Sequence, residues 1–215
     1  GTDGGVFKSA DAGTTWTQLA SVPTTQGMGT LATTDVLNLE IDPKDKFVLY
    51  AGTRGSGLVS TEDAAVSWRL PRQAVLREGN VLNVEVDPNN SCHIYLAKAN
   101  RLYETTNCGR SFNDETYVET RAGITIVQIA IDWYNQGTVW IGLNNGDLLK
   151  STDNGKSWKS VLKIGEEISE ILFNNKDSRQ MIIASYKIGM QRTTDGGEHW
   201  EKVDGGLSKL TGTGA

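Results

Sequence analysis

The chain has 215 residues, a formal net charge of −5, 24 glycines, four prolines and two cysteines. The negative charge argues against a general nucleic-acid binder, which would need a basic face. No apolar run approaches the roughly 18–20 residues of a membrane-spanning helix, so no transmembrane segment is predicted in this chain.

The first twenty residues contain an eight-residue motif that returns four times. It reads Ser/Thr-x-Asp-x-Gly-x-Ser/Thr-aromatic, and we call it the Asp-box. The five copies are "SADAGTTW" (9–16), "TEDAAVSW" (61–68), "TTNCGRSF" (105–112), "STDNGKSW" (151–158) and "TTDGGEHW" (193–200). Their final aromatic residues are 42 to 52 positions apart, and such a period indicates a repeat architecture.

From residue 36 onward, two apolar runs precede each Asp-box. The first runs are "VLNLEIDP" (36–43), "VLNVEVDP" (81–88), "IVQIAIDW" (126–133) and "ISEILFNN" (168–175). The second runs are "FVLYAGT" (47–53), "HIYLAKA" (93–99), "TVWIGLN" (138–144) and "MIIASYK" (181–187). A third short run enters the box and a fourth leaves it. Four short strands per unit, separated by Gly, Asn and Asp, predict antiparallel blades of a propeller.

We therefore predict an all-β protein, a β-propeller of four-stranded antiparallel blades with Asp-box turns. Residues 1–20 form an outer half-blade, because "GTDGGVFKS" aligns with "GTRGSGLVS" (52–60). The four full blades are expected at 36–75, 81–119, 126–164 and 168–203. The Thr/Gly-rich link from Ser21 to Asp35 is predicted as a surface loop. The tail lacks a "VLNLEIDP"-like run, which favours a fragment of a longer propeller over a single complete one.

The Asp-box residues predict turn chemistry rather than catalysis. The Asp side chain can accept backbone N–H groups of the turn, and the Gly can adopt positive φ. The aromatic residue is expected to pack between blades. Ala65 replaces Gly in the second box and Asn107 replaces Asp in the third, which a turn tolerates and a carboxylate catalyst would not. The predicted structural positions are Asp11, Gly13, Trp16, Asp63, Trp68, Asn107, Gly109, Phe112, Asp153, Gly155, Trp158, Asp195, Gly197 and Trp200.

These boxes resemble the Asp-box, or BNR, repeats of sialidases, sortilin-type receptors, xyloglucanase-type glycoside hydrolases and photosystem II stability/assembly factors. The phrases "DP…LYAGT…STDNGKSW" are most similar to the assembly factors. The resemblance covers nearly the whole chain and implies the propeller fold. It also implies a binding scaffold for membrane-protein maturation, although families that share the box differ in chemistry.

Blade geometry indicates where a ligand would bind. The connections between strands 1 and 2 and the Asp-boxes lie at one end of each blade. The connections between strands 2 and 3 and the links between blades lie at the other end, which we call the opposite face. The candidate binding residues on it are Arg54, Lys98, Asn100, Arg121, Asn144, Asn145, Tyr186 and Lys187.

Polar residues also recur on the innermost strands. Asn38, Asn83, Gln128 and Glu170 are equivalent, as are Glu40, Glu85, Ala130 and Leu172. They could form a ligand-binding ring. The interpretation we favour is hydrogen bonding between neighbouring inner strands, because unpaired buried polar groups are costly.

The sequence does not favour an enzyme. A glycosidase needs two carboxylates about 5–9 Å apart, and several acids on the opposite face could supply them: Glu78, Asp114, Glu115, Glu119, Asp147, Glu166 and Glu167. No residue pair stands out, and the Arg-Ile-Pro signature of sialidases is absent. No nucleotide or zinc-protease motif is present. With only His93 and His199, no metal site and no cofactor is predicted.

Cys92 and Cys108 both fall in the third blade, at the same end of one sheet. Cys92 is expected in the connection between the first two strands, and Cys108 lies in the box. A disulfide is favoured over two free thiols, and it would imply an exported protein.

We therefore predict a non-catalytic protein-binding or assembly scaffold, exported to a periplasmic, cell-surface or lumenal location. Its expected partners are proteins, including membrane-associated ones, and not nucleic acids. The alternative is a carbohydrate-active propeller, either a glycoside hydrolase or a glycan-binding domain.

Overall fold

The computed structural model describes residues 5–19, 22–24, 27–29, 35–112 and 115–203. Their regular structure is β-strand, apart from one 3₁₀ turn, η2 (Ala74–Leu76). No helix in these ranges is long and apolar enough to cross a membrane. The predicted all-β class is confirmed.

Each sheet follows the chain as an antiparallel meander. The half-blade pairs β1 (Phe7–Lys8) with β2 (Thr17–Gln18). Blade 2 contains β5 (Val36–Ile41), β6 (Leu49–Thr53) and β7 (Leu58–Thr61). Blade 3 contains β8 (Val81–Asp87), β9 (Asn90–Lys98), β10 (Arg101–Thr105) and β11 (Glu115–Val118). Blade 4 contains β12 (Ile126–Ile131), β13 (Val139–Leu143), β14 (Asp147–Ser151) and β15 (Lys159–Lys163). Blade 5 contains β16 (Glu170–Asn174), β17 (Asp177–Ser185), β18 (Gly189–Thr193) and β19 (Glu201–Lys202).

Two details differ from the sequence-based expectation. The fourth strand of blade 2 is reduced to one bridge between Ser60 and Arg69, because Pro71 follows and cannot donate to a ladder. The link expected to be a surface loop contains a hairpin of β3 (Val22–Thr24) and β4 (Gly27–Gly29).

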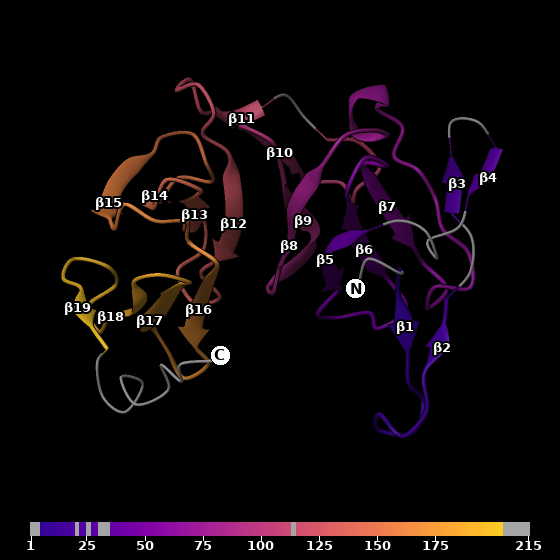
Figure 1. Cartoon of the computed structure of the whole chain (residues 1–215), viewed down its shortest axis with the longest axis horizontal. Helices are drawn as coiled ribbons and strands as arrows, with labels where there is room; N and C mark the ends of the chain where they lie inside the picture. Colours follow the sequence, from indigo (N-terminus) through magenta and orange to yellow (C-terminus); the bar gives the residue numbers. More distant parts are fainter. Residues whose placement is uncertain (1–4, 20–21, 25–26, 30–34, 113–114, 204–215) are drawn as a thin grey trace, which may run out of the picture.

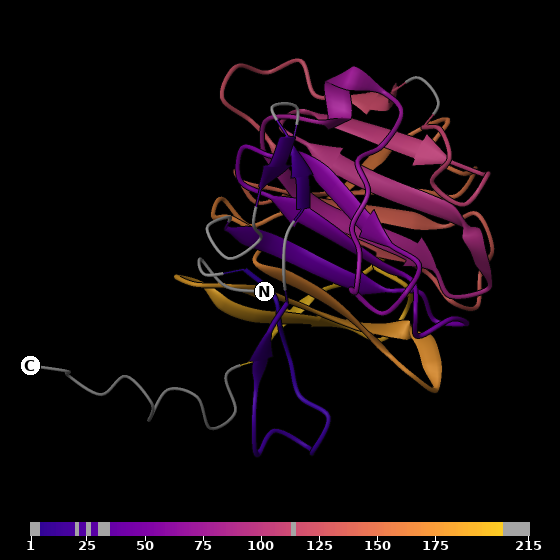
Figure 2. The ribbon, with the colours of Figure 1, turned by 90° about the vertical axis from the view of Figure 1, so that its right-hand side faces the viewer.

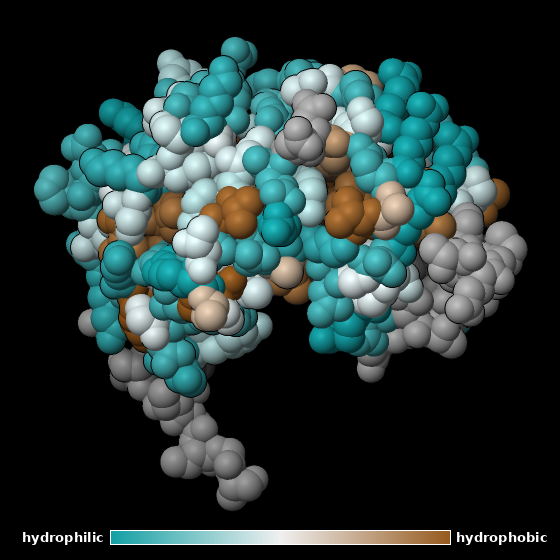
Figure 3. Space-filling view, turned by 90° about the horizontal axis from the view of Figure 1, so that it is seen from above, coloured by the Kyte–Doolittle hydropathy of each residue, from teal (hydrophilic) through white to brown (hydrophobic). Residues whose placement is uncertain are grey.

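The sheets are arranged as the blades of a β-propeller, in an arc around a common axis (Figure 1). The first strands β5, β8, β12 and β16 lie innermost, and successive inner strands are in contact. Turned by 90°, the sheets are seen stacked one behind another (Figure 2). Seen from above, the surface is largely hydrophilic and its hydrophobic residues form separate spots (Figure 3).

The hydrophobic core consists of layers between neighbouring blades. Tyr50 and Leu58 of blade 2 pack against blade 3, and Tyr95 and Leu102 of blade 3 pack against blade 4. Trp140 of blade 4 packs against blade 5. Each blade therefore needs its neighbour in order to bury both faces of its sheet, as expected of a repeat architecture.

The Asp-box of blade 4 shows the local chemistry. Asp153 Oδ1 accepts the backbone N–H of Ser157 at 2.8 Å, and its Oδ2 accepts the Ser157 hydroxyl at 2.6 Å. Ser151 Oγ accepts the N–H of Gly155 at 2.8 Å and donates to Asp153 Oδ1. The hydrogen bonds from Ser157 and Ser151 lower the pKa of Asp153 to about 2. The carboxylate therefore holds the turn closed and is not available as a proton donor.

Each box turn needs two residues in the left-handed region. In blade 4 they are Asn154, at φ +57°, and Gly155, at φ +77°. Blade 2 places Ala64 and Ala65 there, at +58° and +70°. The N–H of Ala65 still reaches Thr61 Oγ1 at 3.0 Å, so the turn forms without glycine.

The box aromatics lie at the layers between blades. Trp68, Phe112, Trp158 and Trp200 join the clusters shared with the preceding blade. Trp158, for example, contacts the Tyr117 ring edge-on at 5.5 Å between centroids. Trp16 belongs to the half-blade and is 62% exposed.

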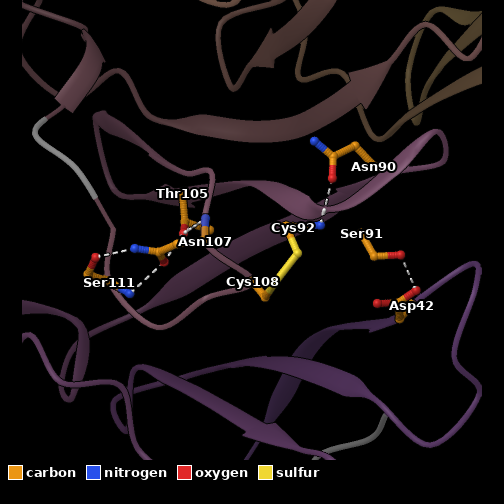
Figure 4. The surroundings of a disulfide bond; sticks show 8 residues. All are labelled: Asp42, Asn90, Ser91, Cys92, Thr105, Asn107, Cys108 and Ser111. Carbon is orange, nitrogen blue, oxygen red and sulfur yellow. Dashed lines mark hydrogen bonds between the residues drawn. A yellow bond between two sulfur atoms is a disulfide. The ribbon is translucent and has the colours of Figure 1, made fainter.

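The predicted disulfide between Cys92 and Cys108 is confirmed (Figure 4). Cys92 lies inside β9 rather than in the preceding connection, because β9 begins at Asn90. Its carbonyl accepts the N–H of Cys108 at 3.1 Å. Gly137 and Asn154 make the same backbone bond in blade 4, so the disulfide reinforces a contact that the repeat already makes.

Removing this disulfide should lower the free energy of unfolding by about 3 kcal/mol in the chain-entropy model. The variant is Cys92→Ser with Cys108→Asn, because Asn154 occupies the Cys108 position in the blade 4 box at φ +57°. Urea unfolding of this variant and of the wild type, with and without reductant, measures the effect. An oxidised wild type no more stable than the double variant would contradict it.

Candidate functional site

The opposite face is formed by the β6–β7, β9–β10, β13–β14 and β17–β18 turns and by the links between blades. Strand direction alternates within each blade, which separates this face from the Asp-boxes. The eight predicted binding residues lie in or beside these turns and links.

On blades 2 and 3 the predicted residues hold loops together. Arg54 Nε donates to Asp35 Oδ2 at 2.7 Å while its side chain stays 61% exposed. The Lys98 ammonium donates to the carbonyl of Val75 in the link that follows blade 2. Burial lowers the pKa of Lys98.

Two of the three predicted asparagines, Asn100 and Asn144, also fasten links. Asn100 Nδ2 donates to the Glu119 carbonyl at 2.8 Å, and the Glu119 N–H donates back to the Asn100 carbonyl. Asn144 Oδ1 accepts the Thr125 N–H at 3.1 Å, and its Nδ2 donates to the Gly123 carbonyl at 3.0 Å. Both side chains are engaged in positioning the link between blades 3 and 4.

Arg121 is the centre of a charged network on that link. Its Nη2 and Nε donate to Glu119 at 2.7 and 2.9 Å, and its Nη1 donates to Asp147 at 2.6 Å. Tyr117 donates to Glu119, and Asn145 donates to Asp147. The Glu119 and Asp147 side chains are 4% and 8% exposed, whereas Arg121 is 47% exposed.

The network keeps both acids ionised. Hydrogen bonds from Arg121 lower the pKa of Glu119 to about 2. Burial opposes ionisation of Asp147, but the bonds from Arg121 and Asn145 outweigh it and lower its pKa. A general acid must hold its proton near the working pH, so this pair does not fit that role.

The blade 4–5 part of the face is the most exposed. Lys187 pairs with Glu166 at 3.0 Å and is 75% exposed. Tyr186 is 88% exposed, and its side chain makes no hydrogen bond within the described ranges. Tyr186 is therefore the predicted residue best placed to meet a partner.

The other acids predicted on this face include Glu115 and Asp114. Glu115 is paired with Arg101. Asp114 lies outside the described residues. Over the ranges the structure covers, no group of three or more His, Cys, Asp or Glu residues could hold a metal. His93 bonds Glu104 inside blade 3, and His199 bonds Asp195 in its box.

The inner strands are linked by their polar side chains. Asn38 Oδ1 accepts the Val84 N–H at 3.0 Å. Asn83 Nδ2 donates to Gln128 Oε1 at 3.4 Å, and Gln128 Nε2 donates to the Ser169 carbonyl at 2.7 Å. These bonds run from one blade to the next through Asn38, Asn83 and Gln128, as hydrogen bonding between inner strands predicts. Asn83 Oδ1 is buried without a hydrogen-bond partner among the described residues.

Three carboxyl groups, those of Glu40, Glu85 and Glu170, also lie on the inner strands. Burial raises the pKa of Glu40 to about 7, and the charge of Asp42 adds to the effect. Burial, Glu40 and Glu170 raise the pKa of Glu85. The sequence aligns Glu40 with Glu85. It does not reveal that Glu170 also raises the pKa of Glu85, because Glu170 belongs to the other set of equivalent inner-strand positions.

The raised pKa of Glu40 predicts a pH dependence of stability. The folded state binds the proton more tightly than the unfolded chain, whose pKa is about 4.5. This contribution to stability is therefore complete below pH 4.5 and is lost as the pH rises through about 7. Glu40→Gln should flatten the fall in melting temperature between pH 5 and 8, with Glu78→Gln as the exposed control. An unchanged slope would contradict the assignment.

The family model described as photosynthesis system II assembly factor YCF48 matches residues 1–188. The chain belongs to this family. The resemblance predicted from the Asp-boxes is thus confirmed.

A Ycf48 protein and a xyloglucanase are both similar to the chain. The photosystem II assembly lipoprotein Ycf48 of Synechococcus sp. (strain CC9902) is 29% identical over 157 residues, covering 72% of this chain and 46% of the relative. A probable oligoxyloglucan-reducing end-specific xyloglucanase of Neosartorya fischeri is 26% identical over 187 residues, covering 76% and 23%. The chain thus spans less than half the length of either relative.

Solved structures agree on the fold. An ancestral GH74 enzyme has a TM-score of 0.69 at 18% identity, covering 88% of this chain and 25% of that one. YCF48 bound to D1 peptide has a TM-score of 0.61 at 18% identity, covering 86% and 56%. At these identities the likeness shows the propeller fold alone.

Proposed function

We propose that the chain is a non-catalytic protein-binding scaffold that assists assembly of a membrane-associated partner. The main support is the YCF48 family match over residues 1–188. A solved structure with a similar fold, YCF48 bound to D1 peptide, supports a polypeptide as the partner.

The opposite face supports binding rather than catalysis. Glu119 and Asp147 are held ionised by Arg121, and Glu166 is paired with Lys187. The links are fastened to the turns, so a partner would meet a preformed surface with little ordering cost. Tyr186 and Lys187 supply an exposed aromatic ring and a cation at the edge of that surface.

The disulfide and the relatives support a location outside the cytoplasm. Structural disulfides are typical of oxidising compartments, and the similar Synechococcus protein is a lipoprotein. We propose a periplasmic, cell-surface or lumenal site of action.

The second candidate is a carbohydrate-active propeller. The observation that favours it is the similarity to xyloglucanases over about three quarters of this chain, as in the Neosartorya fischeri relative at 76%. The charged pairs on the opposite face argue against hydrolysis there.

Affinity capture from native membranes, run beside a glycan array and a cleavage assay, distinguishes the two. We expect a defined membrane-associated protein to be captured by the wild type and lost with Tyr186→Ala plus Lys187→Glu. Val66→Ser in the blade 2 Asp-box is the control, because Val66 is 82% exposed at the other end of the propeller. Glycan binding with bond cleavage, and no captured protein that depends on Tyr186 and Lys187, would overturn the proposal.

A further inference from the structure

The first turn of blade 4, residues 132–138, has the same pattern of hydrogen bonds as the first turn of blade 2, residues 42–48. Asp132 Oδ1 accepts the N–H groups of Tyr134 and Asn135, as Asp42 Oδ1 accepts those of Lys44 and Asp45. In both turns the backbone N–H of the Asp donates to the carbonyl of the last residue of the turn. The N–H of that last residue donates to the carbonyl three positions before it. The two turns are thus an internal comparison, with the same hydrogen bonds and different side chains.

Apart from the shared Asp, the side chains of the two turns differ, and two neighbouring positions carry the argument. Blade 2 has Pro43 and Lys44 where blade 4 has Trp133 and Tyr134. Because the turn forms with Pro and Lys, it does not require the aromatic pair. Tyr134 is 72% exposed, and burial does not explain its presence either. A single exposed aromatic residue is common on protein surfaces, so Tyr134 points to a binding site only together with the Trp133 ring and the recess that both residues line.

The neighbouring blade holds the indole in place. Trp133 Nε1 donates to the Asn174 carbonyl of blade 5 at 3.2 Å. The rings of Trp133 and Tyr134 meet edge-on, 5.9 Å apart at 76°. The aromatic pair is therefore oriented before any ligand arrives, which lowers the entropy cost of binding.

A recess of about 470 Å³ lies between this turn and the corresponding turn of blade 5. Its lining is aromatic on the blade 4 side and polar on the blade 5 side: Trp133, Tyr134, Asn135, Lys176, Asp177, Ser178 and Arg179. A concave site with an apolar wall and a few placed polar groups is typical of small-ligand sites.

Charge in the recess is largely balanced. Arg179 donates to both oxygens of Asp177, at 3.0 and 2.9 Å, and its side chain is 71% exposed. The pair leaves the outer N–H groups of Arg179 open to a ligand. Lys176 remains at the rim. The arrangement fits an uncharged ligand that has both an apolar surface and many hydroxyl groups better than a strongly charged one.

We propose that this recess on the Asp-box end of blades 4 and 5 binds a neutral oligosaccharide without cleaving it. The C–H face of a pyranose ring can pack on Tyr134 or Trp133. Asn135 Nδ2 already donates to Asp132 and Ser178, so a sugar hydroxyl can donate to Asn135 Oδ1 or accept from the Arg179 side chain. Hydrogen bonds from Arg179 lower the pKa of Asp177, so this acid has no proton to give to a glycosidic oxygen. The site lies at the other end of the propeller from the proposed protein-binding face and does not depend on it.

The test is titration with cellotetraose, mannotetraose and galactotetraose, followed by tryptophan fluorescence and by saturation-transfer NMR. We expect saturable binding of at least one sugar, weakened about tenfold by Tyr134→Lys. This variant places the blade 2 residue, Lys44, at the equivalent position of a turn with the same hydrogen bonds, so it should fold. Tyr186→Lys, on the opposite face, is the matched control and should bind the sugar normally.

Absence of saturable binding by all three sugars up to about 10 mM would overturn the proposal. So would equal binding by Tyr134→Lys and wild type, or binding of an acidic peptide alone. Capture of the protein partner should be unchanged in Tyr134→Lys, so failure of the sugar site and failure of the scaffold function are distinguishable.

Discussion

Gly197→Ala is expected to lower the free energy of unfolding by about 4 kcal/mol. Gly197 in the blade 5 Asp-box has φ +90°, where an alanine is strained by about 1–2 kcal/mol. A Cβ there would also lie well inside contact distance of the Trp140 ring of blade 4. That ring is 1% exposed and packed on all sides, so it cannot move aside, and overpacking adds about 1–3 kcal/mol.

The adjacent Gly196→Ala is the matched control. Gly196 has φ +75°, but a Cβ there meets nothing within 4 Å. It should therefore cost only the backbone strain, about 1–2 kcal/mol. Urea unfolding of the two variants separates strain from the clash. Equal losses would show that Trp140 does not press on the box, and would contradict the packing of blade 4 on blade 5.

Arg121→Met is expected to lower the free energy of unfolding by about 3 kcal/mol at pH 7. The substitution keeps an unbranched apolar stem and removes the guanidinium group with its charge. It leaves the carboxylates of Glu119 and Asp147 buried without their cation, and such uncompensated pairs are strongly destabilising. The partial exposure of Arg121 places the loss at the lower end of the usual range.

The loss should shrink as the pH falls, because the variant can protonate the two acids once their pKa values rise. Lys187→Met is the control on the same face. Its pair with Glu166 is exposed, so the change should cost less than about 1 kcal/mol. An Arg121→Met variant with wild-type stability at pH 7, or a loss that is the same at pH 4, would contradict the network.

The repeat made much of the fold predictable. Five copies of one motif place Asp153, Gly155 and Trp158 in a turn between two strands, and the structure contains that turn. The outer strand of blade 2 was harder to predict, because Pro71 follows two residues after Arg69 and ends the pairing there. The β3–β4 hairpin lies in a Thr/Gly-rich link, where strand patterning is weak.

The sequence predicts which end of the blades forms the opposite face, but it does not predict what each side chain on that face contacts. Alternating strand direction places Asn100 and Asn144 at the correct end of the blades. Their hydrogen-bond partners, however, lie 19 or more positions away in the links, and no local pattern reveals them. Trp133 and Tyr134 were not predicted as binding residues, although their signal is local in the sequence. They interrupt the "DP" pattern of blades 2 and 3, and that departure is visible only when the blades are aligned.

The central claim is that the Asp-boxes maintain the fold while the opposite face binds the partner. Its most direct test compares Asp153→Ala with Tyr186→Ala, measuring melting temperature and affinity for the captured partner in parallel. Asp153→Ala should melt at a lower temperature and bind with wild-type affinity, because it loses only turn hydrogen bonds. Tyr186→Ala should melt like the wild type and bind more weakly. An Asp153→Ala variant with wild-type melting and lost binding would contradict the claim.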